Sequence, residues 1–178
     1  MNTGIFIKNH EIDMLKFVRL FKNYYLGISF IGIAAFVIQE IPYIVMPLIN
    51  PASNPIMNMQ NEIEWIEMMQ GIFGMLSMIM LMLIVRDDVK LIPLVSAEEK
   101  VYFSLTVFMI SINFAGWTAY YMGYQYEWLI VISQFAAVPL YYLFFRLWKR
   151  NYLLVWTAVP FFVIHTINGI LNFIVNKL

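Results

Sequence analysis

The chain contains no cysteine and few charged residues. Of its 178 residues, 12% are charged and 62% are apolar, whereas charged residues make up about 25% of an ordinary soluble domain. The lack of cysteine excludes disulfide bonds, thiolate nucleophiles and thiolate metal ligands. Because a water-soluble fold of this size needs more polar surface, the composition predicts an integral membrane protein. We expect it in the cell membrane, surrounded by the lipid bilayer.

Motifs for the common membrane enzymes are also lacking. The sequence has no P-loop, no glycine-rich dinucleotide fingerprint, no H-E-x-x-H and no G-x-S-x-G. The net charge is zero, which gives no reason to expect a nucleic-acid partner. The 13 methionines are interpreted as apolar filler and not as copper ligands. We therefore expect no catalytic residue, metal site or cofactor, and the sequence favours a non-enzymatic protein without identifying its activity.

Five long uncharged runs separate the charged residues. Each run is long enough to cross about 30 Å of hydrocarbon as a helix of about 20 residues. None shows the alternation of apolar and polar residues that a membrane β-barrel requires. We predict an all-α bundle of five transmembrane helices in a single domain, 1–178, with spans at about 23–46, 64–86, 100–122, 127–146 and 152–175.

Residues 1–22 precede the first span as a cytoplasmic lead-in. Met14, Val18 and Phe21 share one helical face, and Lys16 and Arg19 share another. This pattern is typical of an amphipathic helix at the membrane interface that runs into the first span. A partly ordered tail is the alternative.

The cationic residues predict the orientation of the bundle. Ten of the eleven Lys and Arg residues fall on one side of a five-span arrangement. By the positive-inside rule, this side is cytoplasmic, so the N-terminus lies inside the cell and the C-terminus outside. The residues on the inner side are Lys8, Lys16, Arg19, Lys22, Arg86, Lys90, Lys100, Arg146, Lys149 and Arg150, and Lys177 is outside.

The sequence predicts where two of the helices begin. Ser96 precedes Glu99 by three residues, which fits a capping box at the start of the third span. Asn61, followed by Glu64, fits a helix cap at the start of the second span.

Polar side chains within the predicted spans gather in their outer halves. At 1.5 Å per helical residue, Glu40 lies about 27 Å from Lys22, and His165 lies about 22 Å from Arg150. Unpaired polar groups are costly in hydrocarbon, so these side chains should face the bundle interior. The cytoplasmic halves are almost wholly apolar. We predict a pocket that opens to the outside and binds a small or lipophilic ligand, lined by Gln39, Glu40, Gln70, Asn113, Trp117, Gln134, His165 and Asn168.

Three functions remain open at this point. The first is ligand binding in the predicted outer pocket, as part of a transport system. The second is an accessory subunit or immunity-type protein that binds another membrane protein, in which His165 and Asn168 only join helices by hydrogen bonds and Glu40 reaches the hydrated outer interface. The third is a lipid-modifying enzyme that uses Glu40 or His165 as acid or base.

Overall fold

The computed structural model describes residues 14–49, 63–89 and 91–175. Lys8, Lys90, Lys177 and the predicted helix cap at Asn61 therefore lie outside the described residues. Within them, five helices are long and apolar enough to cross a membrane, which confirms the prediction of five apolar helical spans. The elements are β1 (Met14–Phe21), β2 (Tyr24–Ser29), α1 (Phe30–Ile49), α2 (Glu64–Leu83), β3 (Ile84–Arg86), α3 (Ala97–Tyr121), α4 (Glu127–Ile130), the π-helix η3 (Val131–Ala136), α5 (Ala137–Trp148), the 3-10 helix η4 (Tyr152–Leu154) and α6 (Val155–Phe173).

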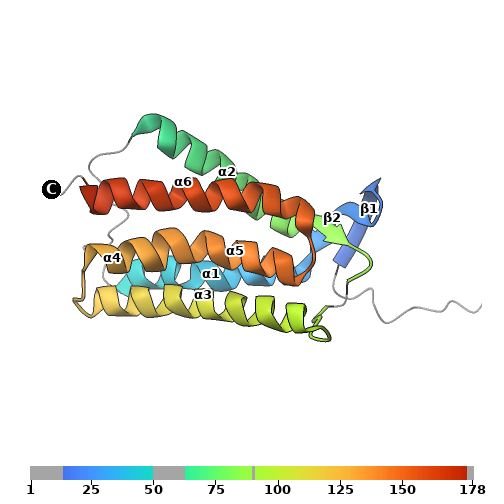
Figure 1. The fold of residues 1–178 in the computed structure, drawn as a ribbon, viewed down its shortest axis with the longest axis horizontal. Coiled ribbons are helices and arrows are strands. Elements are labelled where there is room, and N and C mark those ends of the chain that lie inside the picture. The colour runs from blue at the N-terminus through green and yellow to red at the C-terminus, as the bar shows by residue number, and fades with distance from the viewer. Residues whose placement is uncertain (1–13, 50–62, 90, 176–178) are drawn as a thin grey trace, which may run out of the picture.

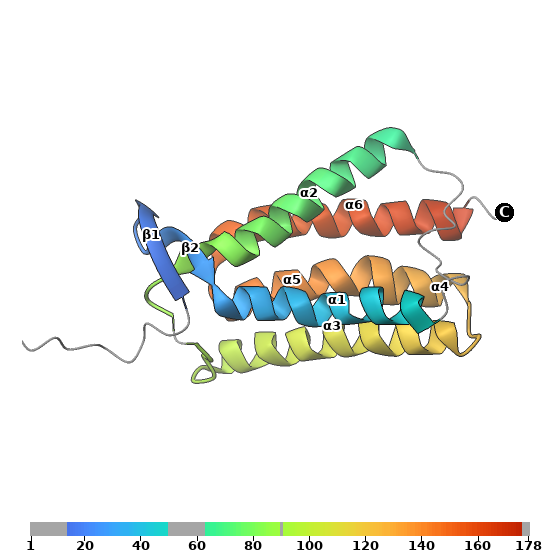
Figure 2. The same ribbon diagram turned by 180° about the vertical axis from the view of Figure 1, so that it is seen from behind.

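The long helices lie side by side and run up and down through the bundle (Figure 1). All three strands lie at one end, which we call the sheet end, and the turn 122–126 between α3 and α4 lies at the other, which we call the turn end. Seen from behind, α2 is inclined to the other helices (Figure 2). The predicted capping box is confirmed: the Ser96 hydroxyl accepts a hydrogen bond from the Glu99 backbone N–H, and the Glu99 carboxylate accepts one from the Ser96 backbone N–H.

The fold is mostly helical but not all-α, and the amphipathic helix that was one of two expectations for residues 1–22 is not found over residues 14–22. Residues 14–29 form an antiparallel hairpin, β1–β2, and β3 adds a third strand beside β2. The first long helix consequently begins at Phe30, seven residues later than predicted. The Ser29 hydroxyl accepts a hydrogen bond from the Gly32 backbone N–H (3.0 Å), which caps α1 where the strand ends.

Two β-bulges explain why the sequence pattern resembled a helix. The pairing of β1 with β2 slips between Lys16 and Val18, and again between Arg19 and Phe21. Each bulge adds one residue to β1, so side chains three positions apart return to the same face of the strand. Lys16 and Arg19 thus share one face of a strand, although their spacing of three is also that of a helix.

The composite helix α4–η3–α5 occupies the centre of the bundle. It is 61% buried over its most apolar stretch, against 22–28% for the other four helices. Its π-helical segment and Pro139 both disturb the backbone hydrogen bonds, because Pro139 has no N–H to donate to the preceding turn. Helix α6 supplies donors instead: the Thr166 hydroxyl donates to the Phe135 carbonyl (3.4 Å), and His165 bonds the Gln134 carbonyl.

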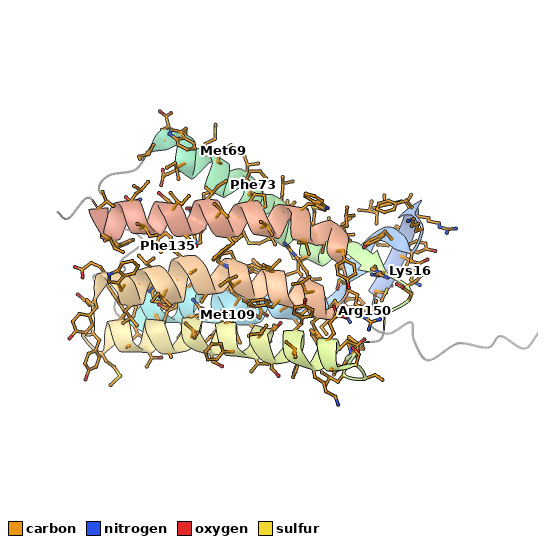
Figure 3. All side chains as sticks on the ribbon, viewed as in Figure 1. Lys16, Met69, Phe73, Met109, Phe135 and Arg150 are labelled. Carbon is orange, nitrogen blue, oxygen red and sulfur yellow. The ribbon has the colours of Figure 1, made fainter. Side chains whose placement is uncertain are left out.

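The charged residues divide between the two ends. Every Lys and Arg that the structure describes lies in the strands, helix ends and loops of the sheet end, and Figure 3 shows Lys16 and Arg150 there. Glu64 and Glu127 begin helices at the turn end. The sheet end also carries Asp87, Asp88, Glu98 and Glu99, but its cations outnumber these carboxylates. Over the described residues, its net charge is therefore positive and that of the turn end is negative.

Candidate functional site

The eight residues of the predicted pocket lie in several small groups of contacts. Six of them (Gln39, Asn113, Trp117, Gln134, His165 and Asn168) contact residues on neighbouring helices. Gln70 completes one of these contacts as the acceptor for Asn168. Glu40 has no hydrogen bond or ion pair among the described residues.

The first group joins α1, α3 and η3. The Asn113 amide donates to the Ser133 carbonyl (2.8 Å) and to the Tyr43 hydroxyl (3.4 Å). Trp117 is fully buried, and its ring meets that of Tyr43 edge to face at 4.8 Å. A Cβ atom on Gly116 would lie 2.1 Å from the Ser133 side chain, so the backbone of α3 packs directly against Ser133 of η3. These residues hold helices together.

The second group joins α2 and α6. The Asn168 amide donates to the Gln70 side-chain oxygen (2.8 Å), and the Asn168 side-chain oxygen accepts from Asn172 (2.8 Å). This chain of amides crosses between two apolar helices and satisfies polar groups that would otherwise face hydrocarbon.

The third group surrounds η3. His165 lies between the rings of Phe135 and Phe161, with centroid distances of 4.8 and 5.0 Å. Gln134 is 1% exposed, and neither atom of its side-chain amide has a hydrogen-bond partner within the described residues. The indole Nε1 of Trp117 also lacks a partner, so two of the predicted residues have buried side chains without a hydrogen bond among the described residues.

Gln39 and Glu40 lie deeper than predicted. Gln39 is buried, and its side-chain oxygen accepts a hydrogen bond from the Tyr142 hydroxyl (2.5 Å). Because α1 begins at Phe30, Glu40 lies only about 15 Å along the helix and is the eleventh of its twenty residues. The interpretation of Glu40 as a group at the outer edge of the span was therefore wrong: it sits at the helix midpoint.

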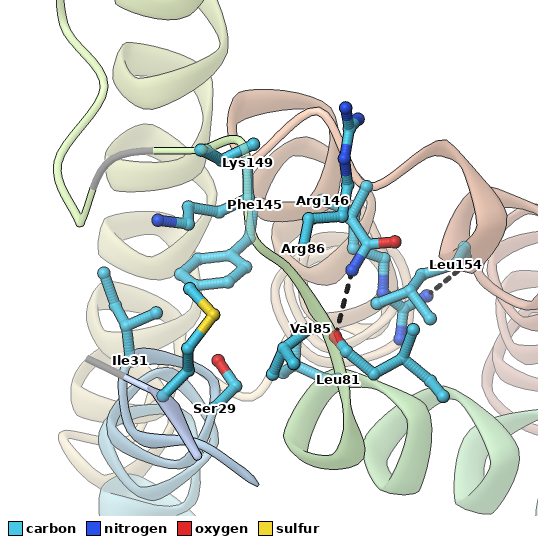
Figure 4. Close-up of a pocket in the computed structure, with 13 residues that line it drawn as sticks. Ser29, Ile31, Leu81, Val85, Arg86, Phe145, Arg146, Lys149 and Leu154 are labelled. Carbon is cyan, nitrogen blue, oxygen red and sulfur yellow. Dashed lines mark hydrogen bonds between the residues drawn. The ribbon is translucent and has the colours of Figure 1, made fainter. Parts of the chain in front are cut away.

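A pocket opens at the sheet end, which contains none of the eight predicted residues. It has about 460 Å³ of empty space, including the part open to solvent. Figure 4 draws this sheet-end pocket, whose apolar walls come from β1, β3, α1, α2, α5, η4 and the loop after β3. It is lined by Met14, Ser29, Ile31, Leu81, Ile84, Val85, Arg86, Val89, Phe145, Arg146, Lys149, Asn151 and Leu154.

The lining of the sheet-end pocket combines apolar and cationic side chains. Arg86, Arg146 and Lys149 carry positive charge, and the lining contains no Asp or Glu. Arg86 is held by the Asp88 carboxylate and by the Arg150 carbonyl, and the Lys149 ammonium donates to the Leu91 carbonyl (2.8 Å). The pocket therefore suits an anion attached to an apolar body.

Arg146 is the most unusual of these residues because it is 0% exposed and lacks an ionic partner. Its guanidinium donates to the carbonyls of Ser77 and Leu154 (2.9 Å to Leu154). Its Nε has no hydrogen-bond partner, and no Asp or Glu of the described residues pairs with it. Burying a charge without a counter-ion is costly, so this arrangement needs an explanation beyond packing.

Both carbonyls that contact Arg146 have other donors. The Leu154 carbonyl accepts a hydrogen bond from the Thr157 hydroxyl (3.0 Å). The Ser77 carbonyl lies inside α2, where the helical hydrogen-bond ladder supplies a backbone N–H. Since neither carbonyl depends on Arg146, the backbone would remain satisfied without it.

Sequence reasoning missed Arg146 because it counted every cation as part of a cytoplasmic loop. The sheet-end halves of the helices, which were expected to be almost wholly apolar, therefore contain a buried cation. The signal lay in the next two residues: Leu147 and Trp148 extend the apolar pattern by most of a turn, which carries α5 past Arg146. The Trp148 indole N–H donates to the Pro93 carbonyl (2.7 Å). This hydrogen bond joins the end of α5 to the loop that precedes α3.

Two ion pairs of the described residues lie at the sheet end, near the pocket. Arg150 pairs with Glu99 (3.1 Å), and Arg86 pairs with Asp88. Partial burial on its own would raise the pKa of Asp88, but the hydrogen bonds and charge of Arg86 outweigh it and hold that pKa below its ordinary value. In β2, a hydrogen bond to Asp87 raises the pKa of the Tyr25 hydroxyl. Within the described residues, no group of three His, Asp or Glu side chains is placed to hold a metal ion.

Comparisons with protein-family models, with curated proteins and with solved structures found no match to this chain.

Proposed function

We propose that this chain is a small multi-pass membrane protein that binds an anionic amphiphile in the sheet-end pocket. The observation that carries the proposal is Arg146, a fully buried cation with a free Nε and no carboxylate partner among the described residues. An anion in the pocket would supply the missing counter-charge, and charge-assisted hydrogen bonds of this kind are about twice as strong as neutral ones.

The ligand class follows from the lining. Eight of the lining side chains are apolar and three are cationic, which favours a phosphate or carboxylate group on an acyl chain over a free inorganic anion. The distribution of Lys and Arg supports an orientation with the sheet end in the cytoplasm. In that orientation, the ligand comes from the cytoplasmic leaflet of the cell membrane, which is rich in anionic lipid. The predicted pocket at the turn end remains a second, untested location.

Thermal unfolding of the purified protein in neutral detergent tests the proposal. The additions are phosphatidylglycerol, phosphatidylcholine with the same acyl chains, and glycerol phosphate. Saturating phosphatidylglycerol should raise the melting temperature of the wild type by roughly 5–10 °C. Phosphatidylcholine should not, because it lacks net negative charge. A shift with glycerol phosphate as large as that with the lipid would identify a headgroup site without a role for the apolar walls.

The decisive variant is Arg146→Met, which keeps most of the side-chain volume and removes the charge. Because both carbonyls keep other donors, we expect the ligand-free variant to melt at or above the wild-type temperature and to lose the lipid-induced shift. Lys100→Met is the control, since Lys100 is exposed at the same end and does not line the pocket. A large loss of stability in Arg146→Met, with no lipid shift in the wild type, would show that Arg146 is structural and would refute the proposal. Val89→Phe, which fills the pocket, should also abolish the shift.

Glu40 favours a second candidate function, that of a subunit bound to another membrane protein. It lies at the midpoint of an apolar helix without an ion pair in the described part of the chain, and ionisable residues at this depth usually have a partner. Val37 and Ile44 share its helix face and are exposed. A photo-crosslinker at Ile44 should capture a defined protein partner in cell membranes, and Glu40→Gln should reduce that capture. If Glu40→Gln leaves the capture unchanged, Glu40 takes no part in binding the partner.

A further inference from the structure

The β1–β2 hairpin has two faces of opposite character. The register of the strands places Leu15, Val18, Phe21 and Leu26 on one face. Lys16 and Arg19 lie on the other face, where the Lys16 ammonium sits 5.4 Å from the centre of the Tyr25 ring. The contact of the Phe21 and Tyr24 rings, 4.9 Å apart, agrees with this division. The two bulges maintain it along the whole strand.

The apolar face is uncovered by the rest of the chain that the structure describes. Leu15, Val18 and Phe21 are 46%, 56% and 46% exposed, and Leu26 is 38% exposed. On the opposite face, Val85 of β3 is buried against Gly27 of β2, whereas Lys16 and Arg19 of β1 are exposed. Phe17 and Leu20, which the bulges leave without a partner in β2, add two further exposed apolar side chains. This much clustered apolar surface marks an interaction site.

The hairpin is joined to the membrane spans without a linker. Ser29 ends β2, and Phe30 begins α1. In the same way, Leu83 ends α2 and Ile84 begins β3. The sheet must therefore lie where these two helices leave the hydrocarbon, within reach of the lipid headgroups. Amphipathic segments in this position lie in the interface with their apolar face buried and their Lys and Arg residues directed to the polar side.

Pairing with a second copy of the chain is the competing use of this hairpin. β1 is an edge strand, because the strand order is β1–β2–β3. However, edge strands that carry bulges and cationic side chains are poor templates for strand pairing, and β1 has both. Its cations also complement anionic lipids and would repel the same cations in a second copy.

We infer that the hairpin is an interfacial anchor, whose apolar face of Leu15, Val18, Phe21 and Leu26 inserts among the headgroups of an anionic lipid leaflet. Lys16, Arg19 and Lys22 hold it there by attraction to the lipid phosphates, with side chains long enough to reach around the edge of the strand. The anchor fixes the depth of the bundle at its cationic end. This inference is independent of the ligand proposed for the pocket.

The natural absence of cysteine permits a direct test by single spin labels. Val18→Cys and Arg19→Cys are labelled with a nitroxide and compared in vesicles of phosphatidylcholine that contain phosphatidylglycerol. The neighbouring residues lie on opposite faces, so they form a matched pair. We expect the ratio of oxygen to water-soluble nickel collision rates to be several-fold higher at position 18 than at 19. Ile44→Cys in α1 and Met122→Cys in the turn calibrate the lipid and water limits.

Other outcomes would overturn the inference. Equal nickel access at positions 18 and 19 would place the hairpin in water. Spin–spin broadening between copies at position 18 would assign the apolar face to a second protein chain. Leu15→Cys and Lys16→Cys repeat the comparison in case a substitution at 18 or 19 disturbs the fold. Replacing Lys16 and Arg19 together by Gln should remove the difference in insertion depth between anionic and neutral vesicles.

Discussion

The two ends of the bundle treat buried polar groups in different ways. At the turn end, the buried polar groups are neutral amides, and Asn113 and Asn168 find partners on neighbouring helices. At the sheet end, the most deeply buried charged group is Arg146, which lines a pocket and has one nitrogen unpaired. The turn-end groups are neutral and join helices, even though Gln134 stays unpaired within the described part of the chain. Arg146 carries a full charge without a counter-ion among the described residues, which is far costlier to bury than an unpaired amide, and such a group is suited to an anionic ligand. The unpaired charge therefore makes the sheet end the better candidate for a binding site.

The largest expected loss of stability comes from adding a side chain at a glycine contact near the turn end. A Cβ atom at position 116 would lie 2.1 Å from the Ser133 side chain, so Gly116→Ala should destabilise the fold by about 3 kcal/mol. A Cβ atom at position 71 would meet nothing within 4 Å. Gly71→Ala, the matched control, should be neutral or stabilising by up to about 1 kcal/mol. Unfolding in mixed detergent micelles gives both free energies, and equal values for the two variants would contradict the close contact of α3 with η3.

A pair of amide substitutions sharpens the same comparison. Asn168→Leu breaks the hydrogen bonds to Gln70 and Asn172, and we expect it to lower the free energy of unfolding by about 1–2 kcal/mol. Gln134→Met removes an amide that has no partner among the described residues, so it should be neutral or stabilising. A Gln134→Met variant that is as unstable as Asn168→Leu would mean that Gln134 also bonds the bundle together. The same unfolding measurement in mixed micelles applies.

The smallest expected effect belongs to the ion pairs at the sheet end. The pKa of Asp88 is lowered in the folded state, so its pair with Arg86 contributes stability above the ordinary carboxyl pKa of about 3.9. This contribution is lost as the pH falls through the lowered pKa. Because the pair is partly exposed, it should amount to less than about 1 kcal/mol. Thermal unfolding between about pH 6 and pH 3 should show the wild type losing its advantage over Asp88→Asn. A constant advantage would exclude the pair as its cause.

The spans were predictable because hydrocarbon imposes a length and a composition on any helix that crosses it. The predicted starts at 64 and 127 coincide with those of α2 and α4. The hairpin was not predictable from periodicity, since the bulges in β1 turn a strand pattern into one with a spacing of three. That single error moved the start of α1 and, with it, the depth of Glu40.

The candidate site could not be predicted from the order of apolar and polar residues along the chain. Asn113, Trp117, Gln134 and Asn168 were predicted to face the interior, and all are buried. Whether such groups line one pocket or satisfy one another is a matter of helix rotation and contact, which the sequence does not encode locally. Arg146 is buried because α5 continues through Trp148 and η4 turns α6 back across it. Its carbonyl contacts come from residues 69 positions before it and 8 positions after it.

The sheet also has a mechanical consequence for the two helices that enter it. β2 leads directly into α1, α2 leads directly into β3, and the pairs from Tyr24 to Leu26 bind the two strands together. A Cβ atom on Gly32 would lie 2.3 Å from the Leu81 carbonyl oxygen, so the helices also touch at this end. Helices α1 and α2 therefore share a pivot at the sheet end. A small rotation there would be magnified along the roughly 30 Å length of α2, so that a slight movement at the sheet end becomes a larger displacement at the turn end.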